Sequence, residues 1–134
     1  MKTPSHKIGS TYPFGLIRAA YGADEPSDSK PPYLLYCGDE IVALCLRYNL
    51  NPKAGEVWIG NEAGIAASGQ QLAALKDKKS LPLYYSPRGR TFYEFKGHHS
   101  IINDTTDAKE LEQRKGSVPL SRIVFISPLK IAAR

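Results

Sequence analysis

The sequence predicts an α+β fold: a small, strongly curved, mostly antiparallel sheet or open barrel with two or three flanking helices. Three observations support this fold class. The predicted elements run in the order strand, helix, strand, helix, hairpin and closing strand, the strands are short and of mixed length, and 134 residues with 42% hydrophobic content fit one globular domain. We therefore treat residues 1–134 as a single domain with its core at about 33–127, and expect residues 1–11 and 22–32 to be mobile.

The core begins with a strand and a short helix. Tyr33 to Tyr36 is rich in Tyr and Leu and predicts a strand. Asp39 to Tyr48 predicts a short helix, because its acidic start suits a helix N-terminus. Its apolar residues also recur at helical spacing: Ile41, Leu44, Cys45 and Tyr48.

A strand containing the single tryptophan comes next. Gly55 to Gly60, GEVWIG, predicts a strand with Val57 and Ile59 on one face and Trp58 on the other. A strand with apolar residues on both faces is either buried twice or lines a cavity. Asn61 then stands where a helix cap is expected.

The second half opens with a helix and a hairpin. Residues 62–78 predict a helix whose buried stripe is Ile65, Leu72 and Leu75, with Ser68 and Gly69 allowing close approach. Leu81 to Tyr85 and Thr91 to Ile102 predict antiparallel strands. Ser86 to Gly89 joins them with the Pro and Gly of a type I turn.

The chain then has a short excursion and a closing strand. Residues 106–115 predict a short helix or loop, in which Asp107 and Glu110 resemble a capping pair. Leu120 to Ile126 is rich in β-branched residues and predicts the last strand, which ends before a proline.

Composition limits the class of protein. Cys37 and Cys45 lie eight residues apart, and we expect both to be reduced, half-buried thiols. Residues 1–10 are polar and lack a signal-peptide core, and the longest apolar run, Ile41 to Leu46, falls far short of the roughly 20 residues of a membrane span. We therefore expect a cytoplasmic protein with no membrane span, no metal and no other cofactor.

Positive charge is concentrated in one segment. The formal net charge is +5, and residues 76–99 hold six basic against two acidic residues, whereas the rest of the chain is nearly balanced. Such a concentration is typical of a surface that binds a polyanion, although a solvated face that keeps a protein in solution can have the same pattern.

The predicted hairpin combines this charge with aromatic rings. Its aromatic residues include Tyr84 and Tyr93, and its basic residues are Arg88, Arg90 and Lys96. Aromatic faces stack on unpaired bases, and guanidinium groups bind phosphates. Neighbouring residues of a strand point to opposite faces, so some of these rings must fill the core.

No catalytic motif stands out. His98 and His99 are adjacent in a strand and point to opposite faces, so they cannot share one metal ion. Either imidazole could act as a general acid or hydrogen-bond a base edge. The thirteen acidic residues are scattered, and the glycines match no phosphate-binding loop.

The order of these segments resembles the PUA-like superfamily. The resemblance rests on GEVWIGNEAGIAASGQQLAAL (55–75), PLYYSPRGRTFYEFKGHHSI (82–101) and VPLSRIVFI (118–126), and covers about residues 33–127. It is greatest to the SRA- and EVE-related domains that accompany restriction nucleases and read modified bases. The resemblance implies a small barrel and an aromatic pocket for a flipped base, with Trp58, Tyr84 and Tyr93 as ring walls and Asn61 as a base-edge contact.

We therefore expect a nucleic-acid-binding module, with DNA favoured over RNA, that is more a reader than an enzyme. In this hypothesis Arg88, Arg90 and Lys96 hold phosphates. Two alternatives remain open. One is a small ribonuclease or nucleotide hydrolase that resembles the ASCH domains of the same superfamily and uses His98 or His99 as its acid–base residue. The other is a protein-interaction domain whose basic hairpin meets an acidic partner.

Overall fold

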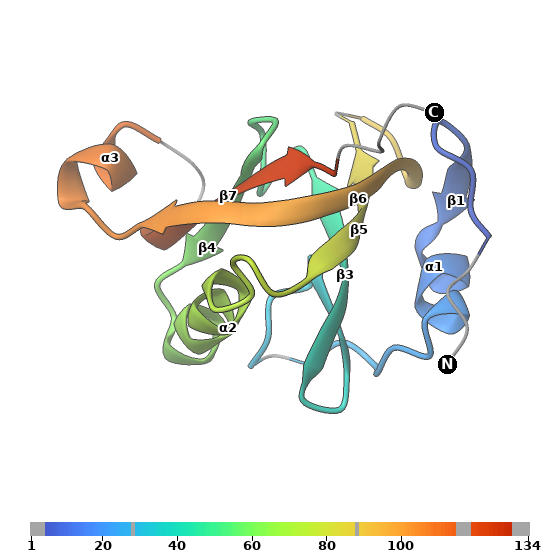
Figure 1. The fold of residues 1–134 in the computed structure, drawn as a ribbon, viewed down its shortest axis with the longest axis horizontal. Helices are drawn as coiled ribbons and strands as arrows, with labels where there is room; N and C mark the ends of the chain where they lie inside the picture. Colours follow the sequence, from blue (N-terminus) through green and yellow to red (C-terminus); the bar gives the residue numbers. More distant parts are fainter. Residues whose placement is uncertain (1–4, 28, 88, 115–118, 130–134) are drawn as a thin grey trace.

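The computed structural model describes residues 5–27, 29–87, 89–114 and 119–129. Within these ranges a seven-stranded sheet and three helices form an α+β fold, as the sequence predicts (Figure 1). The elements are β1 (Thr11–Pro13), α1 (Phe14–Ala20), β2 (Leu34–Cys37), β3 (Glu40–Arg47), β4 (Glu56–Gly60), α2 (Ala63–Ala73), β5 (Ser80–Ser86), β6 (Phe92–Thr105), α3 (Ala108–Glu112) and β7 (Leu120–Pro128).

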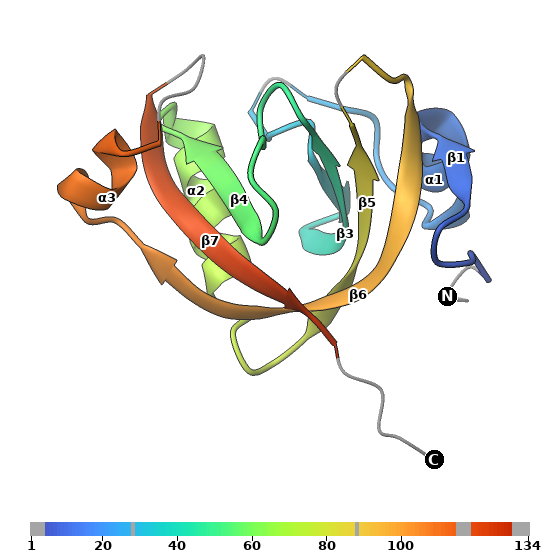
Figure 2. The same ribbon diagram turned by 90° about the horizontal axis from the view of Figure 1, so that it is seen from above.

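The sheet curls into a half-barrel, which Figure 2 shows from above. Its strand order is β2-β3-β5-β6-β7-β4, and every pair is antiparallel except β3 with β5. The long strand β6 makes the curve possible, because it pairs with β1 near Tyr93 and with β7 near Ile101. The prediction of a strongly curved, mostly antiparallel sheet is therefore confirmed.

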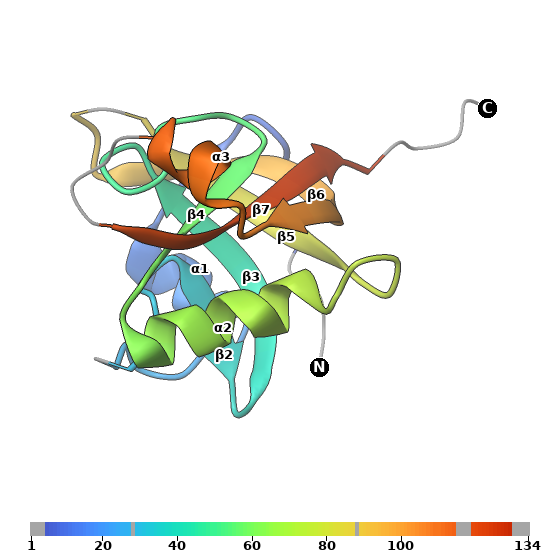
Figure 3. The same ribbon diagram turned by 90° about the vertical axis from the view of Figure 1, so that its left-hand side faces the viewer.

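Each face of the sheet carries its own hydrophobic core. Leu72 of α2 packs in one cluster with residues of β2 to β7, among them Leu44, Val57, Leu81 and Ile101. Ile17 of α1 packs in the other cluster, on the opposite face. The helices α2 and α3 lie on opposite sides of β4 and β7 (Figure 3). Among the residues described, no helix has the length and apolar character needed to cross a membrane.

The helix predicted at 39–48 is wrong, because this segment is the strand β3. Leu44 and Leu46 face the α2 cluster, whereas Ala43 and Cys45 face the α1 cluster. A strand covered on both faces is apolar along its whole length, so its pattern also satisfies helical spacing. The first helix is α1 instead, at Phe14–Ala20, where the sequence analysis assigned no element.

The strand β4 ends the sheet, and side chains take the place of a further strand there. The backbone N–H of Trp58 donates to Asn51 Oδ1 (2.6 Å), and the Tyr33 hydroxyl donates to the Trp58 carbonyl (2.8 Å). Buried backbone groups at a sheet edge need such partners. Val57 and Ile59 lie in the α2 cluster and Trp58 lies on the opposite face, as predicted.

The helix α2 packs closely on β4. A Cβ atom on Gly69 would lie 2.6 Å from Ile59 Cγ2, so the small residue expected to allow close approach does so. The helix is shorter than predicted, and Asn61 is not its cap: Glu62 occupies the N-cap position, without a side-chain cap hydrogen bond. The predicted stripe is confirmed, since Leu72 is buried and Ile65 and Leu75 pack against the same cluster.

The hairpin and the closing strand are confirmed. The strands β5 and β6 pair antiparallel, and the Arg90 N–H donates to the Pro87 carbonyl (3.1 Å), which places the turn one residue later than predicted. Asp107 caps α3 by accepting from the Glu110 N–H. Cys37 and Cys45 are both free thiols, and burial raises the pKa of Cys45.

Candidate nucleic-acid interface

The structure does not bring the three predicted ring walls together. Tyr84 is fully buried and Tyr93 is 6% exposed, and both belong to the cluster under α1. Trp58 is 7% exposed and lies on β4, the last strand in the sheet order, whereas Tyr84 lies on β5 and Tyr93 on β6. A base cannot stack on a ring without an exposed face. Tyr84 and Tyr93 are therefore core residues, and a single pocket walled by these three rings is not formed.

The Tyr84 hydroxyl is held in a buried polar chain. It pairs with the Tyr21 hydroxyl (2.8 Å) and with His6 Nδ1 (2.5 Å), and the His6 ring stacks on Tyr12. Burial raises the pKa of Tyr84 and of Tyr21, and burial lowers the pKa of His6. These groups stay neutral near pH 7, and they tie the segment before β1 to the sheet.

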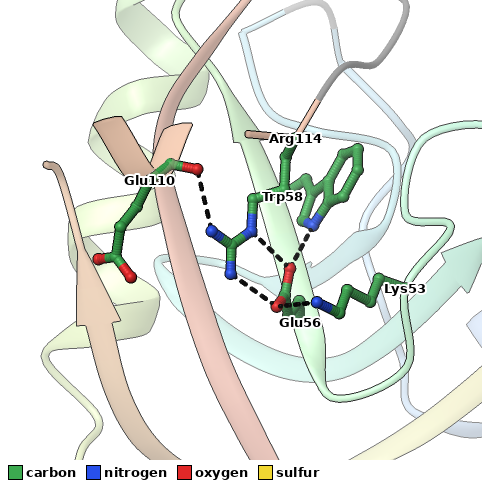
Figure 4. A network of polar contacts seen from close by, with 5 residues as sticks. All are labelled: Lys53, Glu56, Trp58, Glu110 and Arg114. Carbon is green, nitrogen blue, oxygen red and sulfur yellow. Dashed lines mark hydrogen bonds and ion pairs between the residues drawn. The ribbon is translucent and has the colours of Figure 1, made fainter. Parts of the chain in front are cut away.

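Trp58 belongs to an ion-pair cluster on the outer side of β4 (Figure 4). Glu56 is two residues earlier on the same face of the strand, and its carboxylate accepts from Trp58 Nε1 (2.8 Å). Arg114, just beyond α3, donates to both oxygens of that carboxylate (3.1 and 2.9 Å), and Lys53 Nζ lies 3.5 Å away. Arg114 also donates to the Glu110 carbonyl (2.9 Å).

The charges in this cluster hold each other in the ionised state. Burial alone would raise the pKa of Glu56, but the hydrogen bonds from Arg114 and Trp58, with the charges of Arg114 and Lys53, outweigh burial and lower it. The bond to Glu56 in turn raises the pKa of Arg114. The side chains of Glu56 and Arg114 are only 6% and 12% exposed, whereas that of Lys53 is 63% exposed. Lys53 is therefore the cation of this cluster that faces solvent.

A cleft opens beside this cluster, and we call it the Trp58 cleft. It has a volume of about 580 Å³ and is lined by Pro52, Lys53, Trp58, Gln113 and Arg114. Volumes between about 300 and 1,000 Å³ are typical of sites for small ligands. Only a small part of the Trp58 ring is exposed here, so the ring supplies a wall of the cleft and offers no open face for stacking.

A second cleft lies at the β5–β6 turn, and we call it the turn cleft. Its volume is also about 580 Å³, and its lining includes Arg47, Tyr48, Asn49, Ser86, Arg90 and Thr91. Arg47 ends β3 and pairs with Ser86 of β5, which brings it beside the turn that carries Arg90. None of the described residues that line this cleft is acidic.

One exposed aromatic ring, Tyr48, lines the turn cleft, and a second, Phe92, lies beside Arg90 without being part of the lining. Tyr48 is 38% exposed and Phe92 is 36% exposed, and the Arg90 guanidinium lies 5.7 Å from the centre of the Phe92 ring. Arg47 also acts on the core beneath it: burial raises the pKa of Tyr93, and the neighbouring Arg47 opposes part of that rise. Cations and exposed rings are thus found together at this end of the sheet.

None of the other predicted residues that the structure describes lines either cleft. Arg88 is outside the described residues. Lys96 is exposed on β6 and pairs with Glu94 (3.1 Å), and it is not part of the turn cleft lining. Asn61 is exposed after β4, where its backbone N–H donates to the Pro119 carbonyl (3.1 Å).

The two histidines have different surroundings. His99 is buried with Nδ1 beside the Gly97 carbonyl (3.2 Å), and its pKa is lowered, chiefly by burial. His98 is half-buried, with its ring edge-on to Phe95. In the part of the chain that the structure describes, no group of three or more His, Cys, Asp or Glu side chains could hold a metal ion.

A scan against protein-family models, a search of curated proteins and a search of solved structures each found no match to this chain. The resemblance to PUA-like domains therefore remains a prediction.

Sequence reasoning found Arg90 and Trp58 but missed Arg47, Lys53 and Arg114. Arg47 was missed because its segment was predicted to be a helix, and nothing then placed this residue beside the β5–β6 hairpin. Arg114 is 58 residues away from Glu56 along the chain, and no local pattern links them. The one available signal was Glu56 itself, a charge on the same strand face as the single tryptophan.

Proposed function

We propose that this chain binds nucleic acid through the turn cleft. The observation that carries the proposal is the juxtaposition of Arg47 and Arg90 at a cleft with no acidic residue among its described lining. Guanidinium groups bind phosphate oxygens bidentately, and two of them in one cleft bind a polyanion far better than a neutral or cationic ligand.

Three further features support this function. The sequence concentrates its positive charge in residues 76–99, which include the turn. The ring of Tyr48 in the cleft lining and the ring of Phe92 beside Arg90 are partly exposed, and a base that is unpaired or flipped out can stack on such a ring. The resemblance to modified-base readers favours DNA over RNA. In this proposal Tyr48 and Phe92 take the base-stacking role that the sequence assigned to Trp58, Tyr84 and Tyr93.

The test is a binding titration followed by fluorescence anisotropy. Labelled DNA and RNA oligonucleotides, with and without methylated cytosine, are titrated with the wild-type chain at several salt concentrations. Arg47→Ala with Arg90→Ala should weaken binding at least about tenfold. Each lost phosphate contact should also flatten the plot of log affinity against log salt by about 0.7 to 0.9.

A matched control removes two charges elsewhere. Lys76 and Lys78 are exposed between α2 and β5, away from the turn cleft, and their double alanine variant should keep affinity within about twofold. The proposal is overturned if the wild-type chain binds none of the oligonucleotides at 50 mM salt. It is equally overturned if the Arg47/Arg90 variant binds as tightly as the Lys76/Lys78 variant.

A further inference from the structure

We infer that the nucleic acid bound here is a single strand that runs from the turn cleft to the Trp58 cleft across the β3–β4 loop. This inference rests on the proposed function and extends it, since it names the class of nucleic acid and adds a second binding site. The residues that would make the second contact are Lys53 and Gln113, both at the Trp58 cleft.

The β3–β4 loop joins the two clefts directly. Asn49 lines the turn cleft, and Pro52 and Lys53 line the Trp58 cleft. Four residues of extended chain span at most about 14 Å, so the two clefts lie within reach of a few nucleotides. Figures 1 and 3 agree on the arrangement: α3, the β3–β4 loop and the β5–β6 turn all lie along the upper side of the molecule.

The loop between the clefts is held in place. The Tyr48 N–H donates to the Ser86 carbonyl (3.1 Å), and the N–H groups of Leu50 and Asn51 donate to the Arg47 carbonyl (3.1 and 2.8 Å). The buried Asn51 side chain also accepts from the backbone of Trp58. The two clefts are therefore fixed relative to one another before any ligand arrives, which lowers the entropic cost of binding at both.

Lys53 can turn to a phosphate at little cost. Glu56 already has two hydrogen bonds from Arg114 and one from Trp58, so it does not depend on Lys53, whose ammonium is 3.5 Å away. The Lys53 side chain is 63% exposed, and exposed ion pairs contribute little. Lys53 and Arg114 both face the carboxylate of Glu56, and the Glu110 carboxylate, which points away from Arg114 in Figure 4, still raises the pKa of Arg114 through its charge.

The exposed rings favour a single strand over a duplex. Bases in a duplex are stacked on each other and offer no free face to Tyr48 or Phe92, whereas a single strand offers one at every nucleotide. Gln113 is exposed at the far end of the path, and its amide can donate to and accept from a base edge or a sugar.

The experiment is a length series with a charge variant at each end. Oligothymidylates of two to twelve nucleotides, and a duplex of the longest, are titrated with the wild-type chain and with the Lys53→Ala and Lys78→Ala variants. Oligomers of two nucleotides occupy only the turn cleft, so Lys53→Ala should leave their affinity unchanged. From about six nucleotides upward, within the range of site sizes for single-strand modules, Lys53→Ala should weaken binding three- to tenfold and reduce the salt slope by about 0.7.

Each outcome decides between the two proposals. If Lys53→Ala and Lys78→Ala bind equally at every length, the path across the loop is wrong, while the turn cleft stands if the Arg47/Arg90 variant still loses affinity. If the duplex binds more tightly than the single strand of the same length, the inference of a single-stranded ligand is overturned. If no oligonucleotide binds the wild-type chain, the proposed function itself fails.

Discussion

The ion-pair cluster beneath the Trp58 cleft allows a quantitative prediction about stability. The perturbation is Glu56→Gln, which keeps the size of the side chain and one oxygen acceptor but removes the charge. In the wild-type chain this carboxylate is 6% exposed and accepts two hydrogen bonds from Arg114 and one from Trp58. The variant leaves the Arg114 guanidinium, itself 12% exposed, without its partner charge.

The expected loss is about 3 kcal/mol. Removing one partner of a buried ion pair costs about 3–5 kcal/mol, because the other charge remains desolvated. The lower end applies here, since Arg114 follows the short helix α3 and can move toward solvent. Lys53 adds little to the estimate because it is mostly exposed. For a chain of 134 residues this loss corresponds to a fall in Tm of about 10 °C.

The pH dependence of stability independently tests whether the ionised Glu56 carboxylate stabilises the fold. The pKa of Glu56 is lowered in the folded chain, so its ionisation stabilises the fold at pH values above the ordinary pKa of 4.5 and loses that effect as the pH falls. The difference in stability between wild type and Glu56→Gln should therefore be full at pH 7 and shrink below about pH 4.5.

Thermal melts followed by circular dichroism between pH 3 and pH 7 measure both effects. The matched control is Glu40→Gln, which removes an exposed carboxylate paired with Lys79 and should have the same Tm as the wild type. A Glu56→Gln protein that melts within 2 °C of the wild type at pH 7 would refute the reasoning. So would a difference that stays constant down to pH 3.

Two further predictions concern packing on the two faces of β4. Trp58→Ala should destabilise the chain by about 3–5 kcal/mol, as for a truncated buried aromatic, and a Tm close to wild type would instead place the ring mainly in the cleft. Gly69→Ala should cost about 1–3 kcal/mol despite the better helix propensity of Ala, because its Cβ meets Ile59. Gly15→Ala in α1 is the control for Gly69→Ala, since its Cβ meets nothing within 4 Å, and it should be neutral or stabilising.

The elements whose pattern or turn residues are unambiguous locally were predictable from the sequence. The strand β5 alternates so that Leu81 and Leu83 face the α2 cluster and Tyr84 faces the α1 cluster, and the hairpin follows from this pattern and the turn residues. The N-cap at Asp107 was also predictable, because it depends only on Asp107 and on Glu110 three residues later. Such features are local, and local sequence specifies them.

The wrong helix prediction at β3 shows which features the local sequence does not specify. The apolar run of β3 fits a short helix as well as a doubly buried strand, and only its neighbours decide between the two. Those neighbours are β2 on one side and β5 on the other, and the parallel pairing with β5 cannot be inferred from spacing.

That single error also concealed the candidate site. Arg47 is the last residue of β3, and its position opposite Ser86 depends wholly on the β3–β5 register. With 39–48 taken as a helix, Arg47 had no reason to lie beside Arg90, so the sequence assigned phosphate binding to the hairpin alone. The turn cleft exists because two segments about forty residues apart end at the same edge of the sheet, and the cation supplied by β3 turns a basic hairpin into a two-sided site.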